Sequence, residues 1–294
     1  MGKKMLLILN PRSGMMAGKR HLANVLESFC LADYDPLVYV TTGRGHATRL
    51  AAQHGGGVDL VVCLGGDGTF NEVVSGLLSA GHTTPIGYIP CGSTNDFAGS
   101  IGLKKTIPAA TKAILNGDIH TYDVGMFGNR YFSYVASFGA FTHASYAASQ
   151  DVKNALGHLA YVLEGIKEIS KIRPWHVRFE VDDTVLEGDY IFGAVSNSTS
   201  LGGVLTLDPK AVDMNDGLLE LLLVKTPRTP AELNECIRAL VEQRYDSPAL
   251  TFCSAGHLTV TAEPEMEWTL DGEFGGGAQQ VEIRNLKDAI RIVK

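Results

Sequence analysis

The chain has 294 residues, of which 45% are hydrophobic and 19% are charged, and these values are typical of a packed globular protein. This length predicts two domains rather than one small core. The net charge of −7 argues against a basic surface for nucleic acid, so we expect no nucleic-acid partner. The five cysteines are odd in number and never spaced as CxxC, which argues against a disulfide framework and a thiolate zinc site.

The amino-terminal segment predicts a first strand rather than a targeting signal. Lys3 and Lys4 precede only five apolar-leaning residues before Asn10, whereas a secretory signal needs a run of roughly 7 to 15. No apolar run approaches the roughly 18 residues of a membrane-spanning helix. We therefore expect a soluble protein in the cytoplasm.

Strand-like and helical segments alternate through the first part of the chain. The expected strands are residues 5–10, 37–41, 59–64 and 86–89, and the expected helices are residues 19–31, 46–54 and a segment that begins near residue 70. The apolar residues of the first helix recur at the spacing of one helical face: Leu22, Val25, Leu26 and Phe29. This alternation predicts a parallel sheet with helices on both faces, which binds ligands beyond the carboxyl ends of its strands.

The third expected strand runs directly into a glycine-rich loop, GGDGTFNEV, at residues 65–73. Glycines let the backbone approach phosphate oxygens closely, and the N–H groups at the start of the following helix favour negative charge. Asp67 would repel a triphosphate unless Mg²⁺ or its waters lay between them, so we interpret it as metal-linked. The alternative is a plain turn in which Asp67 and Thr69 cap the helix.

Two further polar loops are expected at the same edge of the sheet. Residues 10–14 follow the first strand, and residues 90–97 follow the fourth. Their convergence with the glycine loop predicts a ligand site. Residues 14–20 are one residue short of a GxxxxGK[ST] loop and no GxGxxG opens a helix, so neither common nucleotide motif applies.

After about residue 123 the pattern becomes that of β-strands. Apolar residues alternate with polar ones from Trp175 to Asp182, and several short strands follow. Two helices interrupt them, one near residues 152–172 and one whose start, residues 229–232, reads as a capping box with proline at the first helical position. We expect an α/β domain at residues 1–124, rejoined by residues 287–294, and a mostly β domain at residues 125–286.

The segments NPRSG, GGDGTFNEV and PCGSTNDFA together resemble the diacylglycerol kinase catalytic family of lipid kinases. The resemblance continues through residues 156–161, 197–203, 213–218 and 270–273. It implies a fold like that of NAD kinases, with an α/β nucleotide-binding domain and a β-sandwich that carries catalytic groups. It also implies an enzyme that uses ATP and Mg²⁺ to phosphorylate a hydroxyl of diacylglycerol or a related lipid for phospholipid synthesis.

The resemblance also assigns roles to individual residues. It implies nucleotide contacts at Asn10, Pro11, Arg12, Ser13, Gly14, Thr41, Gly66, Asp67, Gly68, Thr69, Phe70, Asn71, Glu72, Ser93, Asn95 and Asp96. It places the general base at Glu273, and we expect Asp67 and Asp271 to act with it in catalysis. From the residues alone, the Asp-Gly-Glu segment also fits a turn between two strands with solvated carboxylates.

The same resemblance implies a structural Mg²⁺ near residues 213–218. Its ligands would be the backbone oxygens of Asp213 and Leu218 and the carboxylate of Asp216. Carboxylate and carbonyl oxygens are the ligands that this cation takes. A plain Asn-Asp-Gly turn is the alternative.

Two positions depart from the family pattern. Ser93 replaces the usual threonine, and Gly99 replaces the usual basic residue, which leaves the lipid acceptor open. Phosphatidylglycerol, a sphingoid base, undecaprenol and NAD are alternative acceptors, and a catalytically silent nucleotide-binding protein is the alternative outside enzymes. The lipid substrate implies transient contact with a membrane surface, for which the apolar stripe of residues 152–166 is one candidate and core packing the other explanation. A homodimer is the general expectation for assembly.

Overall fold

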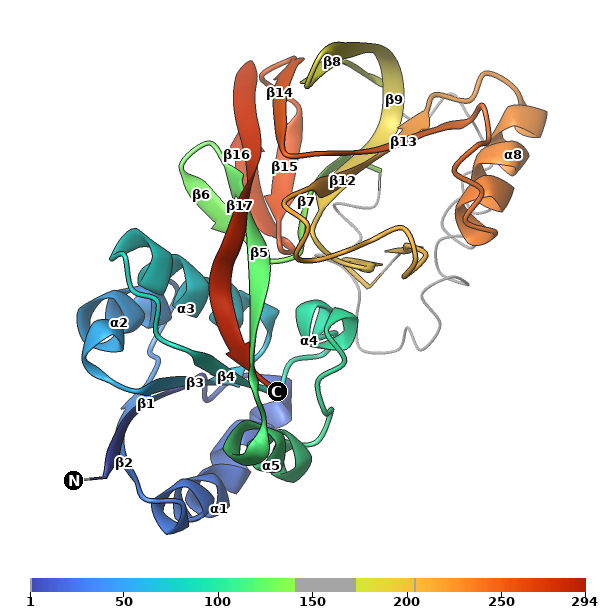
Figure 1. Cartoon of the computed structure of the whole chain (residues 1–294). Coiled ribbons are helices and arrows are strands. Elements are labelled where there is room, and N and C mark those ends of the chain that lie inside the picture. Colours follow the sequence, from blue (N-terminus) through green and yellow to red (C-terminus); the bar gives the residue numbers. More distant parts are fainter. Residues whose placement is uncertain (1, 141–172, 204) are drawn as a thin grey trace. The chain divides into compact units, whose positions relative to one another are not determined.

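The computed structural model describes residues 2–140, 173–203 and 205–294 (Figure 1). The chain divides into two compact units, Met1–Val124 with Lys287–Lys294, and Gly125–Leu286. The division falls inside two long strands, β5 (Ile119–Phe127) and β17 (Gln280–Val293). The expected helix at residues 152–172 and its apolar stripe lie outside the described residues.

The first unit is built on a parallel sheet. Its strands are β1 (Lys3–Leu9), β2 (Tyr34–Val40), β3 (Leu60–Gly65), β4 (Ile86–Pro90) and the end of β17. They lie in the order β2-β1-β3-β4-β17, and the pair Ile292–Ile86 joins the last strand to the sheet. All these pairings are parallel, as the alternation of strands and helices predicts.

Helices cover both faces of this sheet (Figure 1). They are α1 (Ala17–Leu31), α2 (His46–His54), α3 (Asp67–Ser79), α4 (Asp96–Ser100) and α5 (Ile107–Asn116), with short 3-10 turns η1 (Gly14–Met16) and η2 (Gly55–Gly57). Val25 and Phe29 of α1 pack with Ile114 of α5 against one face, in a core that includes Leu7 and Val62. Helices α2 and α3 lie on the opposite face. The predicted apolar face of the first helix is confirmed.

The second unit is mostly antiparallel β-structure. Its strands are β6 (Arg130–Phe132), β7 (Val135–Gly139), β8 (Trp175–Val181), β9 (Thr184–Ser196), β10 (Ser200–Leu201), β11 (Leu205–Thr206), β12 (Leu219–Lys225), β13 (Leu250–Ala255), β14 (His257–Ala262), β15 (Glu267–Leu270), β16 (Glu273–Gly277) and the first part of β17. The main path runs β16-β15-β7-β9-β8-β14-β17, and β12 pairs with β9 and β13. Trp268, Phe138 and Phe179 lie in the core of this unit.

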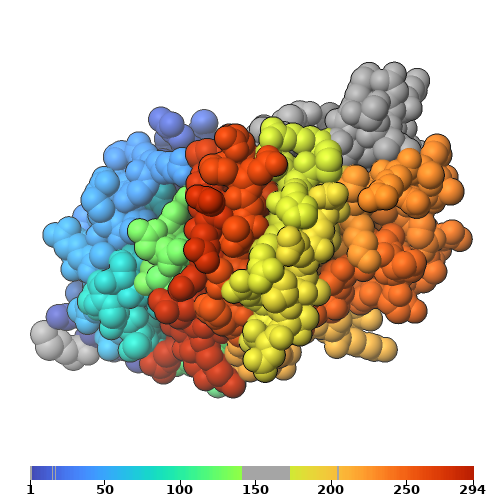
Figure 2. All heavy atoms as spheres, turned by 90° about the horizontal axis from the view of Figure 1, so that it is seen from above, coloured from blue at the N-terminus to red at the C-terminus, as the bar shows by residue number. Residues whose placement is uncertain are grey.

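The alternation predicted for residues 175–182 is confirmed in β8. Val177, Phe179 and Val181 are buried, while His176 is exposed and bonds Asp189 of β9 at 2.9 Å. Figure 2 shows this outer face, with the yellow residues of β8 and β9 beside the red residues of β14 and β17. The polar side chains of β8 therefore face solvent, while its apolar side chains face the core, which is the pattern of a half-buried strand.

One helix, α8 (Pro230–Val241), lies among the described residues of the second unit. Thr229 is its N-cap and accepts a hydrogen bond from the Glu232 N–H at 3.2 Å, with Pro230 in the first turn. The Glu232 carboxylate accepts from the Arg228 N–H at 2.6 Å rather than from Thr229. The predicted helix start is confirmed. In a capping box the Glu232 carboxylate would accept from the N–H of the N-cap residue, and here it accepts from the residue before the N-cap.

Candidate functional site

Three loops of the first unit follow the carboxyl ends of β1, β3 and β4 and pack directly on one another. Gly14 has a φ of +51°, and a side chain there would collide with the carbonyl oxygen of Cys91. A Cβ atom on Gly92 would lie 2.8 Å from the Cα atom of Gly66. Glycine is required at these positions because the backbones touch. The predicted convergence of the loops is therefore present.

Side chains tie the first loop to the glycine loop. The Asn10 amide Nδ2 donates to the Thr69 hydroxyl at 2.9 Å, and the Asn10 Oδ1 accepts from the Arg12 N–H at 3.0 Å. Asn10 thus fixes the shape of its own loop and holds it against the start of α3. Ser13 and Gly14 are half-buried beside them, while Arg12 is exposed.

Asp67 ties the glycine loop to the third loop. One of its carboxylate oxygens, Oδ2, accepts from the Thr94 hydroxyl at 3.2 Å and from the Asp96 N–H at 3.1 Å. The N-cap of α3 is Gly66, which offers no side-chain cap. The side chains of Asp67 and Thr69 thus bond the third and first loops, which the capping alternative did not include.

The helix start is left open for an anion. Helix α3 begins at Asp67 without a side-chain cap, and Gly66 and Gly68 are half-buried rather than enclosed. Backbone N–H groups at such a helix start bind phosphate oxygens, and the helix dipole favours their charge. This geometry fits the predicted phosphate cradle.

The side-chain amide of Asn95 sets the shape of the third loop. Asn95 has a φ of +53°, and its side chain accepts from the Gly92 N–H at 2.8 Å and donates to the Gly92 carbonyl oxygen at 2.9 Å. This leaves Ser93 and Thr94 exposed at the tip. Thr94 was not among the predicted contacts, although its hydroxyl, next to Ser93 in the sequence, is the group that reaches Asp67.

Two predicted nucleotide contacts, Phe70 and Glu72, have side chains that contact other parts of the first unit. Phe70 has no exposed surface, and its ring stacks on those of Tyr88 and Phe97 with centroids 4.5 Å away in each case. The Glu72 carboxylate accepts from the Gly45 N–H at 2.6 Å and from the Ala47 N–H at 3.0 Å. Helix α2 has no side-chain cap from Gly45, so Glu72 supplies that cap from α3.

The remaining predicted contacts of this unit lie near the loops. The Thr41 N–H donates to the Leu9 carbonyl oxygen at 2.8 Å, which holds the end of β2 beside β1. Asn71 accepts from the Ser75 hydroxyl at 3.2 Å within α3. Pro11 is half-buried and Asp96 is buried at the start of α4.

A buried thiol lies behind the glycine loop. Burial raises the pKa of Cys63 well above its ordinary value, and Cys91, Asp67 and Glu72 raise it further. Burial likewise raises the pKa of Cys91 to about 11. Neither group is a thiolate near neutral pH, so this region offers no cysteine nucleophile.

In the second unit, the predicted Asp-Gly-Glu segment forms a tight hairpin. Leu270 of β15 pairs with Glu273 of β16, and the two residues between them, Asp271 and Gly272, have φ of +51° and +79°. Positive φ at both positions is the mark of the two-residue turn that Asp-Gly favours. The turn that we gave as an alternative is therefore present.

The carboxylate of Asp271 is not solvated, and this part of the alternative is wrong. Asp271 is 6% exposed and accepts backbone hydrogen bonds from Ser133 at 2.6 Å and from Tyr134 and Val135 at 3.0 Å each. These bonds anchor the hairpin to the start of β7. Glu273 is half-buried at the first position of β16.

The turn at residues 213–218 has its carboxylates on the surface. Asp213 and Asp216 are exposed and accept from the N–H groups of Asn215 at 3.1 Å and Leu218 at 2.8 Å. The Leu218 carbonyl oxygen accepts from the Asn285 amide at 2.8 Å. Among the described residues no three Asp, Glu, His or Cys side chains gather into a metal cluster. A cation here would depend on backbone oxygens and water, as Mg²⁺ allows.

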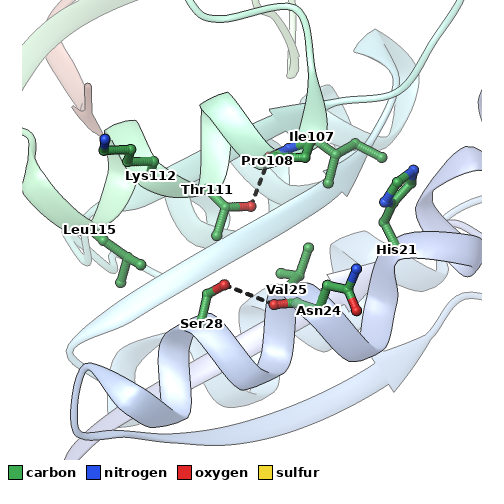
Figure 3. A pocket seen from close by; sticks show the side chains of 9 residues that line it. All are labelled: His21, Asn24, Val25, Ser28, Ile107, Pro108, Thr111, Lys112 and Leu115. Atoms are coloured by element: carbon green, nitrogen blue, oxygen red, sulfur yellow. Dashed lines mark hydrogen bonds between the residues drawn. The ribbon is translucent and has the colours of Figure 1, made fainter.

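A separate groove of about 290 Å³ lies between α1 and α5 (Figure 3). It is lined by His21, Asn24, Val25, Ser28, Ile107, Pro108, Thr111, Lys112 and Leu115. The hydroxyls of Ser28 and Thr111 bond the backbone of their own helices. None of the predicted site residues lines it, so the groove is not part of the predicted site.

The described residues contain no helix that is long and apolar enough to cross a membrane.

Comparisons with known proteins match both units. Residues 4–127 match the diacylglycerol kinase catalytic domain, and residues 135–294 match the YegS C-terminal NAD kinase beta sandwich-like domain. A diacylglycerol kinase of Bacillus subtilis is 33% identical over 276 residues, which cover 93% of this chain and 91% of the relative. One from Staphylococcus epidermidis is 31% identical over 282 residues, which cover 94% of this chain and 87% of the relative.

Solved structures agree on the fold. A putative diacylglycerol kinase from Bacillus anthracis superposes with a TM-score of 0.81 at 24% identity, over 99% of this chain and 95% of that chain. The expected α/β domain and β-rich domain are therefore confirmed.

Proposed function

Because the chain belongs to the diacylglycerol kinase family, we propose that it transfers the γ-phosphoryl group of ATP to a hydroxyl of diacylglycerol or a related lipid. The observation that carries this proposal is the cradle of three loops at the carboxyl ends of β1, β3 and β4, which leaves the start of α3 open to an anion. The product of the reaction would be phosphatidate, for use in phospholipid metabolism.

The cradle residues would divide the work of holding ATP. The N–H groups at the start of α3 would bind phosphate oxygens, and Asn10 and Asn95 would hold the surrounding loops in shape. Asp67 is held by the third loop and would bind Mg²⁺ directly or through water. The bound ion would neutralise charge on the phosphates as the phosphoryl group moves.

Glu273 would act as the general base. A lipid hydroxyl does not ionise near neutral pH, so its proton must leave as the oxygen attacks the γ-phosphorus. In this step the new P–O bond forms, the bond to ADP breaks, and the proton passes to the Glu273 carboxylate. Asp271 would serve as a positioning residue, because its carboxylate is already used by three backbone N–H groups.

We also propose a structural Mg²⁺ at the turn of residues 213–218, held by the backbone oxygens of Asp213 and Leu218 and the carboxylate of Asp216. The enzyme would meet its lipid at a membrane surface without spanning the bilayer, and would assemble as a homodimer. Sedimentation without lipid would measure the assembly state, and sedimentation with lipid vesicles would measure binding to the membrane surface.

The acceptor is tested by incubation with γ-labelled ATP and a panel of diacylglycerol, phosphatidylglycerol, sphingosine, undecaprenol and NAD. We expect label in phosphatidate. Labelling of NAD alone would show that the fold serves an NAD kinase instead, and absence of labelling with bound nucleotide would indicate a silent nucleotide-binding protein.

A further inference from the structure

Strand β16, which carries the proposed base, has an irregular pairing. In the part of the chain that the structure describes, it pairs with β15 alone. Phe274 lies opposite Thr269 and Gly276 lies opposite Trp268, while Gly275 between them has no residue opposite. Such a bulge bends the strand and interrupts the ladder of hydrogen bonds. The segment directly after the base therefore needs support from another part of the chain.

The residues of the bulge have to be glycine, so their own side chains cannot supply this support. A Cβ atom on Gly275 would lie 2.8 Å from the Trp268 carbonyl oxygen, and Gly276 has a φ of +88°. The one residue of β16 between the base and these glycines is Phe274, which is exposed. Packing against the core therefore does not hold this part of the strand.

The side chain of Arg130 makes the missing contact. Its Nη1 atom donates to the Phe274 carbonyl oxygen at 3.2 Å and to the Gly275 carbonyl oxygen at 2.9 Å. Arg130 is half-buried at the start of β6, where it pairs with Phe127 of β5. A guanidinium is planar and always charged, and its hydrogen bonds are stronger than those between neutral groups.

Glu273 thus lies between two anchored points of its hairpin. Two residues before it, the Asp271 carboxylate accepts backbone hydrogen bonds from the start of β7. One residue after it, the Phe274 carbonyl oxygen is held by Arg130. Both anchors come from one short segment, residues 130–135. The backbone on both sides of Glu273 is therefore fixed, and with it the direction in which the carboxylate leaves the strand.

We propose that Arg130 is a positioning residue of the kinase reaction, which holds Glu273 where its carboxylate accepts the proton of the lipid hydroxyl. This inference rests on the proposed role of Glu273 as the base. Arg130 acts through the backbone of β16 and needs no contact with the substrate. A group that is misplaced by about 1 Å costs up to about 10²-fold in rate, so loss of Arg130 should lower kcat. The affinity for ATP should not change, because the nucleotide cradle belongs to the first unit.

The first experiment measures kcat and the KM for ATP in the full chain with diacylglycerol as acceptor. Arg130→Met keeps an unbranched apolar side chain and removes the donors, and we expect kcat to fall by about 10- to 100-fold. Arg130→Lys keeps a charged donor and should recover part of the loss. Arg178→Met is the matched control, because Arg178 is half-buried in the same unit and bonds Glu180 and Glu187 on the outer face. An unchanged kcat in Arg130→Met, or an equal loss in the control, would overturn the inference.

A double-mutant cycle separates positioning of the base from a general loss of structure. If Arg130 acts through Glu273, Arg130→Met should have little further effect on the residual rate of Glu273→Gln. The same fold loss in both backgrounds would refute the role of Arg130 and leave the base standing. Full turnover in Glu273→Gln alone would refute the base itself, which is a different result. If Arg130→Met does not fold, Arg130→Lys takes its place in the cycle.

Hydrogen exchange gives a second reading that does not depend on activity. Backbone amides of residues 273–277 should exchange faster in Arg130→Met than in the wild type, because the bulge loses its hold. Exchange in Arg178→Met should match the wild type over these residues. Equal exchange in Arg130→Met and the wild type would contradict the proposed hold on β16.

Discussion

At the scale of single residues, the cradle depends on side chains that hold loops together. Asp67 accepts two hydrogen bonds from the third loop, and Asn10 joins the first loop to Thr69. These groups keep the cradle in shape before a ligand arrives, so less conformational freedom is lost on binding. Function at this scale can be tested one side chain at a time.

The Glu273→Gln variant should retain the fold and ATP affinity but lose turnover. Glutamine cannot accept the hydroxyl proton as a carboxylate does, so kcat should fall by about 10²- to 10⁴-fold. The exposed Glu267→Gln, on the neighbouring strand of the same hairpin, is the matched control. Turnover that survives Glu273→Gln unchanged would remove Glu273 from the role of base.

Gly99 lies where the family usually has a basic residue, and the structure leaves room for one. It is exposed on α4, and a Cβ atom there would meet nothing within 4 Å. We expect Gly99→Arg to fold and to lower KM for ATP or lipid by about 2- to 5-fold, since a surface charge contributes up to about 1 kcal/mol. Gly99→Gln is the uncharged control, and equal KM values in the two variants would contradict an effect of charge.

At the scale of elements, the hairpin of β15 and β16 is fixed by a contact from far along the chain. Asp271 accepts hydrogen bonds from three consecutive residues that begin at Ser133. Apart from this contact and the bonds of Arg130, the short strand β16, which contains the exposed Phe274 and three glycines, has little to hold it. The position of Glu273 therefore depends on Asp271.

The Asp271→Asn variant should be less stable and should turn over more slowly. Its amide nitrogen would face backbone donors, which leaves at least one buried N–H without an acceptor at a cost of about 1 to 3 kcal/mol. Chemical denaturation measures this loss, and ATP affinity should not change. Asp182→Asn, which occupies the same position with φ of +47° in the exposed turn between β8 and β9, is the control. Equal losses in both variants would show that only turn propensity is affected.

At the scale of the whole molecule, the end of the chain completes the first unit. The last part of β17 pairs with β4 through Ile292, and Ile290, Ile292 and Val293 are buried there. The Lys294 N–H also bonds the Asp118 carbonyl oxygen at 3.0 Å. The first unit is therefore built from two segments that are far apart in the sequence.

Truncation of Ile292 should destabilise the first unit in proportion to the volume removed. We expect Ile292→Ala to cost about 2 to 5 kcal/mol and Ile292→Val about 0.5 to 1.5 kcal/mol, because the side chain has no exposed surface. The measurement is unfolding in urea with and without ATP. If ATP restores none of the lost free energy of unfolding, the altered region is not coupled to nucleotide binding.

The sequence by itself determined the features that depend on neighbours along the chain. The period of apolar residues located α1 and β8, the Thr229 capping box located α8, and three glycine-containing loops located the cradle. These features follow from local sterics and hydrogen bonds, which act over a few residues. The family followed from the same short segments.

Only the tertiary structure decided what several of those side chains do. Phe70 is in the core because Tyr88 and Phe97 stack on it, and Glu72 caps α2 because Gly45 and Ala47 lie within its reach. The bonds of Asp271 to the start of β7 and of Arg130 to β16 have the same origin. Each depends on residues that are distant in sequence and adjacent only after the sheets form, so no local pattern could predict them.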